Sequence, residues 1–160
     1  MRVLIADDHR LIAEGIKRSL EEEPDFEVVA EAQTGSQVLP LIRRTNPDVV
    51  LLDLRMPGTD GLTSLEQIRR DHPSIKVVIL SASSDQAVIQ AALAKGASAY
   101  VLKSVNPVDL AATLRQVMEV QRQFINTLDD RLASLTIDVT RRSAPEGPRR
   151  CTGDRTASTR

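Results

Sequence analysis

The sequence predicts a doubly wound α/β fold with a five-stranded parallel sheet and five helices. Five short runs of aliphatic and β-branched residues alternate with five helical patterns along most of the chain. Several of these runs are apolar throughout, which is typical of parallel strands that helices cover on both faces. Strict alternation of strand and helix also requires right-handed crossovers, and these build a doubly wound sheet.

The individual elements follow from these patterns. The expected strands are residues 3–6, 26–30, 49–52, 77–80 and 99–102. The expected helices place apolar residues three or four positions apart: Ile12, Ile16 and Leu20; Val38, Leu41 and Ile42; Leu62, Leu65 and Ile68; Val88, Ile89, Ala92 and Leu93; Leu110, Leu114 and Val117. Proline inside a helix costs about 3 kcal/mol. At Pro40 we therefore expect either a kink or a late start of the second helix.

The composition is that of an ordinary soluble globular protein. The chain has 160 residues, 41% of them hydrophobic, and a formal net charge of −1, so no global field favours nucleic acid or lipid. Its apolar runs are far shorter than the roughly 20 residues of a membrane span, and the N-terminus has no signal-peptide pattern. We expect a cytoplasmic protein with no membrane partner. The single cysteine, Cys151, has no partner for a disulfide or a zinc site.

The character of the sequence changes after residue 122. We expect residues 1–122 to form the main domain and residues 123–137 a helical linker, because Phe124, Leu128 and Leu132 recur at helical spacing. Residues 138–160 contain too few apolar side chains to bury a core, and we expect a polar disordered tail there.

Acidic and basic residues follow the expected strands where each strand ends. Asp7 and Asp8 follow the first strand, Asp53 ends the third, Ser81 follows the fourth, and Lys103 ends the fifth. Taken singly, an aspartate here most simply caps a helix, and the serine and lysine are ordinary turn and surface residues. Because the carboxyl ends of parallel strands meet at one edge, we expect all five to converge there.

This convergence predicts a metal-dependent phosphoryl acceptor. Three carboxylates at one point repel one another unless a cation neutralises them or some stay protonated. Oxygen-only ligands favour Mg²⁺, which shares carboxylates with phosphoryl oxygens. A carboxylate nucleophile that attacks phosphorus also needs an ammonium and a hydroxyl on the transferring oxygens, and Lys103 and Ser81 provide them. His9 we interpret as a surface residue rather than a ligand.

Four segments at these strand ends carry a resemblance to a known family. LIADDH at 4–9, VVLLDLRMPG at 49–58, VILSA at 78–82 and GASAYVLK at 96–103 closely resemble response-regulator receiver domains of two-component systems. The resemblance covers residues 2–122, and the Asp-Asp-His opening and the Lys-Ser pair are most similar to the NarL/FixJ type. It implies the flavodoxin-like receiver fold.

The resemblance also implies the chemistry of the site. Asp53 is then phosphorylated by a sensor histidine kinase, and Asp7, Asp8 or both bind Mg²⁺ together with Asp53. By matching position, the backbone carbonyl of Arg55 is a further metal ligand. The domain is regulatory rather than an enzyme, although it carries self-phosphotransfer and autodephosphorylation chemistry.

A conformational switch is the second implication of the resemblance. Ser81 and Tyr100 match the switch pair, in which the hydroxyl turns toward the phosphoryl group and the ring changes its burial. Homodimerisation is expected by the same resemblance. Ser104 stands where many receivers have proline, which leaves open whether the preceding peptide bond is cis.

Three alternatives compete with this interpretation. A phosphatase with Asp53 as its nucleophile would need an acid at position 55, which is arginine. A flavodoxin-like cofactor binder would need a phosphate loop rich in Gly, Ser and Thr after the first strand, where Asp7 and Asp8 stand. A non-phosphorylated adaptor that keeps only the fold remains open.

The sequence contains no recognisable helix-turn-helix output domain. Receivers of this type are usually followed by a helix-turn-helix domain that regulates transcription, and residues 138–160 lack the apolar periodicity for one. Specific DNA binding is therefore not supported. A truncated or frame-disrupted regulator and a stand-alone receiver both stay open.

Overall fold

A five-stranded parallel sheet forms the centre of the protein. The computed structural model describes residues 1–106 and 109–119. The strands are β1 (Arg2–Ala6), β2 (Glu27–Ala32), β3 (Val49–Asp53), β4 (Lys76–Ser81) and β5 (Ala99–Leu102). Their order is β2-β1-β3-β4-β5, and every neighbouring pair is parallel. The doubly wound sheet predicted from the alternating pattern is confirmed.

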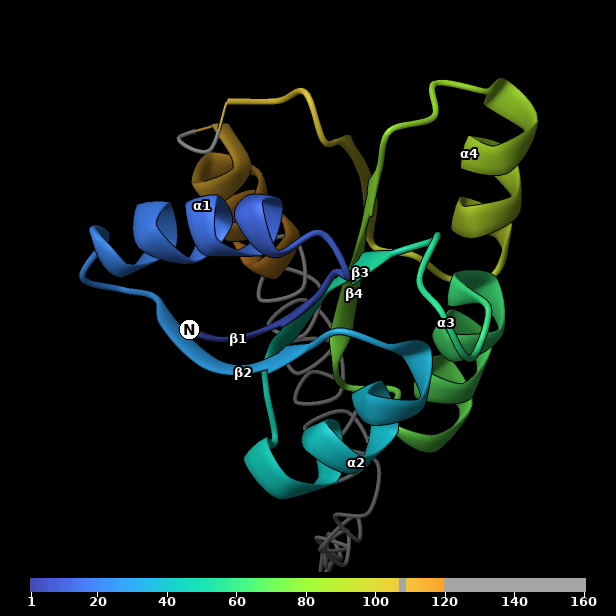
Figure 1. Ribbon diagram of the computed structural model, residues 1–160, viewed down its shortest axis with the longest axis horizontal. Helices are drawn as coiled ribbons and strands as arrows, with labels where there is room; N and C mark the ends of the chain where they lie inside the picture. The colour runs from blue at the N-terminus through green and yellow to red at the C-terminus, as the bar shows by residue number, and fades with distance from the viewer. Residues whose placement is uncertain (107–108, 120–160) are drawn as a thin grey trace, which may run out of the picture. The chain divides into compact units, whose positions relative to one another are not determined.

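Helices cover both faces of this sheet, as Figure 1 shows. They are α1 (Arg10–Glu21), α2 (Gly35–Thr45), α3 (Gly61–Asp71), α4 (Gln86–Ala94) and a last described helix at residues 109–119. The helix α1 and the last helix pack on one face with Val3, Ile5 and Leu51. The other three helices pack on the opposite face with Leu4, Val50 and Leu52. The apolar runs that predicted buried strands therefore supply two separate cores.

The central strand, β3, ends at the edge of the sheet where the candidate functional site lies. All five residues of β3 are buried, and β3 lies between β1 and β4. Its last residue, Asp53, is level with Leu80 of β4, and Ser81 is level with Leu102 of β5. The amide of Lys103 donates to the Ser81 carbonyl at 2.8 Å, which extends this alignment one residue beyond β5.

Two local expectations are settled by the backbone. The helix α2 begins at Gly35 and continues through Pro40, so the expectation of a late start is wrong. Among the described residues there is no cis peptide bond, so the bond before Ser104 is trans. The expected linker and tail, residues 123–160, lie outside the described residues. Within the part of the chain that is described, no helix is long and apolar enough to cross a membrane.

A glycine at the start of α3 allows this helix to approach the end of β3. A Cβ atom on Gly61 would lie 2.5 Å from the Leu54 Cα and 2.8 Å from the Asp53 carbonyl oxygen. Both are backbone atoms, which cannot rotate away as a side chain can. Gly61 thus keeps the segment after Asp53 folded closely against α3.

Replacing this glycine should disturb the end of β3. We expect Gly61→Ala to lower the free energy of unfolding by about 1–3 kcal/mol, as overpacking does. Gly15 in α1 is the control, because nothing lies within 4 Å of its added Cβ. Gly15→Ala should raise stability by roughly 0.5–1 kcal/mol through helix propensity. Urea unfolding of both variants tests this, and equal effects of the two changes would contradict it.

Candidate functional site

The carboxyl edge of the sheet brings together residues from four strands. Asp7 directly follows β1, Asp53 ends β3, Ser81 ends β4, and Lys103 directly follows β5. Each is held there by the register of its strand, and the Asp7 amide also donates to the Ala32 carbonyl at 3.0 Å. Asp7 and Asp53 are 1% and 2% exposed. The sequence therefore placed these residues at the correct edge.

One lysine links the two buried carboxylates. The Lys103 Nζ lies 2.7 Å from Asp53 Oδ2 and 2.8 Å from Asp7 Oδ2. Its side chain is only 8% exposed. A buried charge without a partner is costly. Here the Lys103 ammonium is shared between two carboxylates that lie far apart in the sequence. The ion pairs hold the ends of β1, β3 and β5 together.

Folding keeps this lysine protonated. Burial alone would lower the pKa of Lys103, but hydrogen bonds to Asp53 and Asp7 and the attraction of both charges outweigh it, so the pKa is raised. The positive charge and its contribution to stability are therefore fully present below the unfolded pKa of about 10.4. That contribution is lost only as the pH rises through the higher folded value.

The acidic residues form a pocket compatible with a divalent metal. Oxygens of Asp7, Asp8 and Asp53 and one ring nitrogen of His9 all lie within 4.8 Å of one another. Asp8 Oδ1 is a buried atom that accepts no hydrogen bond, and its close contact is the His9 ring at 2.9 Å. Three carboxylates outnumber the one lysine. The hard oxygen donors and their surplus negative charge suit a small divalent cation.

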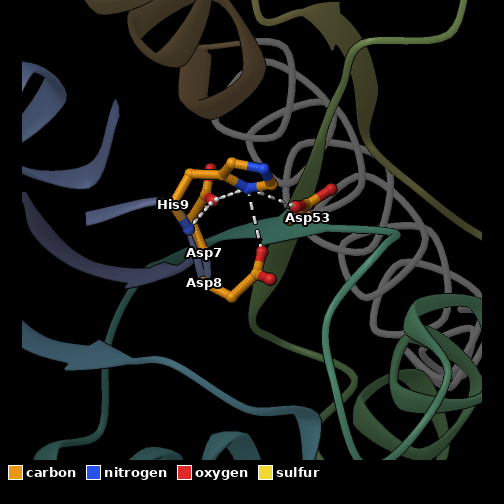
Figure 2. A group of neighbouring side chains, drawn as sticks. All are labelled: Asp7, Asp8, His9 and Asp53. Carbon is orange, nitrogen blue, oxygen red and sulfur yellow. Dashed lines mark hydrogen bonds and ion pairs between the residues drawn. The ribbon is translucent and has the colours of Figure 1, made fainter. Parts of the chain in front are cut away.

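The ring of His9, interpreted from the sequence as a surface residue rather than a ligand, lies at the surface and also borders this cluster. Its Nδ1 is 3.2 Å from Asp7 Oδ1, 2.9 Å from Asp8 Oδ1 and 3.9 Å from Asp53 Oδ2, as Figure 2 shows. The ring is still 58% exposed on its outer side. Adjacency to the Asp-Asp pair was the only signal in the sequence, and it did not reveal the direction of the ring.

The segment after β3 is bound to the same aspartate. The backbone amide of Arg55 donates to Asp53 Oδ1 at 3.0 Å, so Asp53 receives one bond from the chain and one from Lys103. The Arg55 side chain is exposed. This bond fixes the rotamer of Asp53 and directs its carboxylate into the cluster.

The two expected switch residues both bond to the backbone of Ser83, which the sequence suggested only as a capping residue of the next helix; the N-cap of α4 is Asp85 instead. The Ser83 amide donates to Ser81 Oγ at 3.1 Å, and the Tyr100 hydroxyl donates to the Ser83 carbonyl at 2.8 Å. Ser81 is buried, whereas the Tyr100 ring is half-buried against the core. Because Ser83 acts through backbone atoms, its side-chain type gave no signal for this role.

A parallel, doubly wound sheet whose carboxyl edge gathers three aspartates, two of them paired with one buried lysine, defines the receiver class of signalling domain. Residues 3–115 match the response regulator receiver domain family. The chain belongs to this family, and it is the receiver domain of a two-component response regulator. Response regulators are regulatory proteins that sensor histidine kinases phosphorylate.

Curated relatives extend this assignment. The chain is 39% identical over 114 residues to the nitrate/nitrite response regulator protein NarL of Escherichia coli K12, covering 71% of this chain and 53% of that protein. It is 36% identical over 119 residues to the transcriptional regulatory protein DegU of Brevibacillus brevis, covering 74% and 50%. The chain thus spans about half the length of these relatives. Family members of this kind regulate transcription.

Solved structures agree with the fold. The signal receiver domain of a NarL response regulator from Mycobacterium tuberculosis matches with a TM-score of 0.69 and 36% identity, over 73% of this chain and 95% of that one. The isolated receiver domain of RcsB from Salmonella enterica, solved with the phosphomimetic BeF3−, matches with a TM-score of 0.70 and 32% identity, over 74% and 88%. The similarity to NarL agrees with the subtype expected from the sequence.

Removing the shared lysine should destabilise the site. We expect Lys103→Met in Mg²⁺-free buffer to lower the free energy of unfolding by about 3–5 kcal/mol, because two buried carboxylates lose their counter-ion. Added Mg²⁺ should recover part of this loss by binding the folded state. Denaturant unfolding with and without Mg²⁺ measures both effects.

The matched control is a lysine on the surface. Lys95 pairs with Glu66 in an exposed position, so Lys95→Met should cost about 1 kcal/mol or less, and Mg²⁺ should stabilise this variant by the same amount as the native protein, leaving the loss unchanged. Similar losses in the two variants would show that the buried ion pairs contribute nothing special.

Proposed function

We propose that Asp53 is the phosphoacceptor of this receiver and that its phosphorylation by a sensor histidine kinase depends on Mg²⁺. The observation that carries this proposal is the Lys103 ammonium 2.7 Å from Asp53 Oδ2, inside a pocket that also holds Asp7. A phosphoryl group on Asp53 would bring its oxygens to a fixed positive charge. Family membership supplies the donor class, a phosphohistidine.

The transfer is a substitution at phosphorus. A carboxylate oxygen of Asp53 attacks the phosphoryl group of the kinase phosphohistidine, a new O–P bond forms, and the N–P bond breaks with its electron pair going to the imidazole. Lys103 neutralises charge on the transferring oxygens without moving, which is the preorganised stabilisation that such sites provide. A Mg²⁺ ion held by Asp7, Asp8, Asp53 and the Arg55 carbonyl would add positive charge to the same oxygens.

Ser81 and Tyr100 are proposed as the switch that reports the phosphoryl group. If the Ser81 side chain turns toward a phosphoryl oxygen, its hydroxyl oxygen moves away from the Ser83 amide and that hydrogen bond breaks. The Ser83 backbone then loses the bond at its amide. Its carbonyl, which accepts from the Tyr100 hydroxyl, can shift as a result. Phosphorylation is therefore expected to change the position of the Tyr100 ring.

The remaining assignments follow the family. We propose residues 1–122 as the receiver, residues 123–137 as a linker and residues 138–160 as a polar tail, in a cytoplasmic protein that forms a homodimer. The names of the relatives support control of transcription as the output of the whole regulator. We propose no specific DNA contact for this chain, because the sequence of residues 138–160 lacks a helix-turn-helix pattern.

Phosphorylation of the full chain can be tested directly. We expect acetyl phosphate with Mg²⁺ to add the mass of one phosphoryl group, measured by intact-protein mass spectrometry. Asp53→Ala should abolish the gain, and chelation of Mg²⁺ should suppress it in the native protein. Asp71→Asn, which changes a surface carboxylate paired with Arg70, is the control and should leave the gain intact. An unchanged mass in the native protein would instead favour the adaptor interpretation.

The switch has a built-in optical probe. The chain has one tyrosine and no tryptophan, so its tyrosine fluorescence reports Tyr100 alone. Phosphorylation should change this emission in the native protein. Ser81→Ala should still gain mass but lose most of the fluorescence change, because the hydroxyl that moves is gone. In Ser83→Ala both backbone bonds remain, and the change should persist; its loss there would argue against the proposed route.

A further inference from the structure

The direction of the His9 ring is unusual for its place in the fold. His9 is the N-cap residue of α1, yet its side chain makes no hydrogen bond to that helix. Its Nδ1 instead lies among the carboxylates, closest to Asp8 and Asp7. Figure 2 shows this nitrogen facing all three aspartates. The ring therefore belongs to the acidic pocket and not to the helix cap.

The backbone of His9 is fixed beside the pocket. The His9 amide donates to Asp7 Oδ1 at 2.8 Å, and the His9 carbonyl accepts from the amides of Ile12 and Ala13. The residue is thus fixed on one side by a carboxylate of the pocket and on the other by the first turn of α1. Its place depends on the turn after β1 and not on a chance surface contact.

An imidazole nitrogen changes which cations a carboxylate pocket prefers. Mg²⁺ favours oxygen ligands and gains little from a ring nitrogen. Late first-row divalent ions such as Co²⁺, Ni²⁺ and Zn²⁺ bind imidazole well, and binding through Nδ1 leaves the proton on Nε2, on the other side of the ring. Asp7 is buried beside His9, so its carboxylate and the ring nitrogen are close enough to bind one cation together.

We propose that His9 sets the metal preference of this site by acting as a nitrogen ligand for late first-row divalent cations. The pocket then binds Co²⁺ more tightly than its oxygen ligands alone would allow, while Mg²⁺ binding depends on the carboxylates. This inference rests on the proposed function only in requiring that the acidic pocket binds a divalent cation.

The test compares two metals and two histidines. All proteins are full-length and carry Cys151→Ser, which removes the only thiol that could bind Co²⁺. Calorimetric titration with Co²⁺ and with Mg²⁺ is made on this background, on His9→Ala and on His72→Gln. His72, at the end of α3, is the only other histidine in the chain and controls for incidental binding to a ring.

We expect His9→Ala to weaken Co²⁺ binding roughly ten-fold or more, on the scale of losses at metal sites, and to change Mg²⁺ binding far less. His72→Gln should leave both affinities unchanged. The visible absorption of bound Co²⁺ should also shift in His9→Ala, because a nitrogen ligand is lost, and a purely structural role of His9 would not produce this shift.

Two results would overturn the inference. Unchanged Co²⁺ affinity and spectrum in His9→Ala would show that the ring is no ligand. Tighter binding of both metals in that variant would show that the ring only occupies space that a cation would take. In either case, Mg²⁺ binding and phosphorylation of the background protein would leave the proposed function standing, whereas absence of binding by both metals would refute both proposals.

Discussion

The attraction between Lys103 and the two buried carboxylates of Asp7 and Asp53 is the constraint on which the rest of the site depends. These side chains come from segments that are far apart in the sequence and meet only because three parallel strands end at the same level. Removing the lysine leaves two buried carboxylates without their shared counter-ion. The same geometry that stabilises the resting protein also places a positive charge where a phosphoryl group would arrive.

The strand ends bring together more negative than positive side chains, so the site has an excess of negative charge. One lysine is set against three aspartates, and the closest additional group is an imidazole. The sheet can bear this because the strands beneath are mostly apolar and packed on both faces, so the polar edge is supported by two hydrophobic cores. The two hydrophobic cores supply the stability of the fold. The excess negative charge at the edge of the sheet can therefore favour the binding of a cation.

Much of this could be predicted from the sequence, and the failures have physical causes. Apolar strand runs and residues at strand ends are local signals, so the sheet and the positions of Asp53 and Lys103 followed from them. The start of α2 at Gly35 did not, because it depends on contacts across the fold: the Gly35 amide donates to the Pro57 carbonyl at 3.1 Å, and a Cβ there would lie 2.2 Å from the Thr59 carbonyl oxygen. The direction of the His9 ring depends on its contacts with Asp7 and Asp8, which no residue pattern indicates.

The position of Ser83 has a mechanical consequence for the proposed switch. The amide that holds Ser81 and the carbonyl that holds Tyr100 belong to one residue, so only two rotatable backbone bonds separate them. A linkage this short has almost no slack. A shift of the Ser83 backbone would disturb both hydrogen bonds at once, so in the proposed switch the movements of the serine and the tyrosine should be coupled, and states in which only one of them has moved should be less populated than either end state.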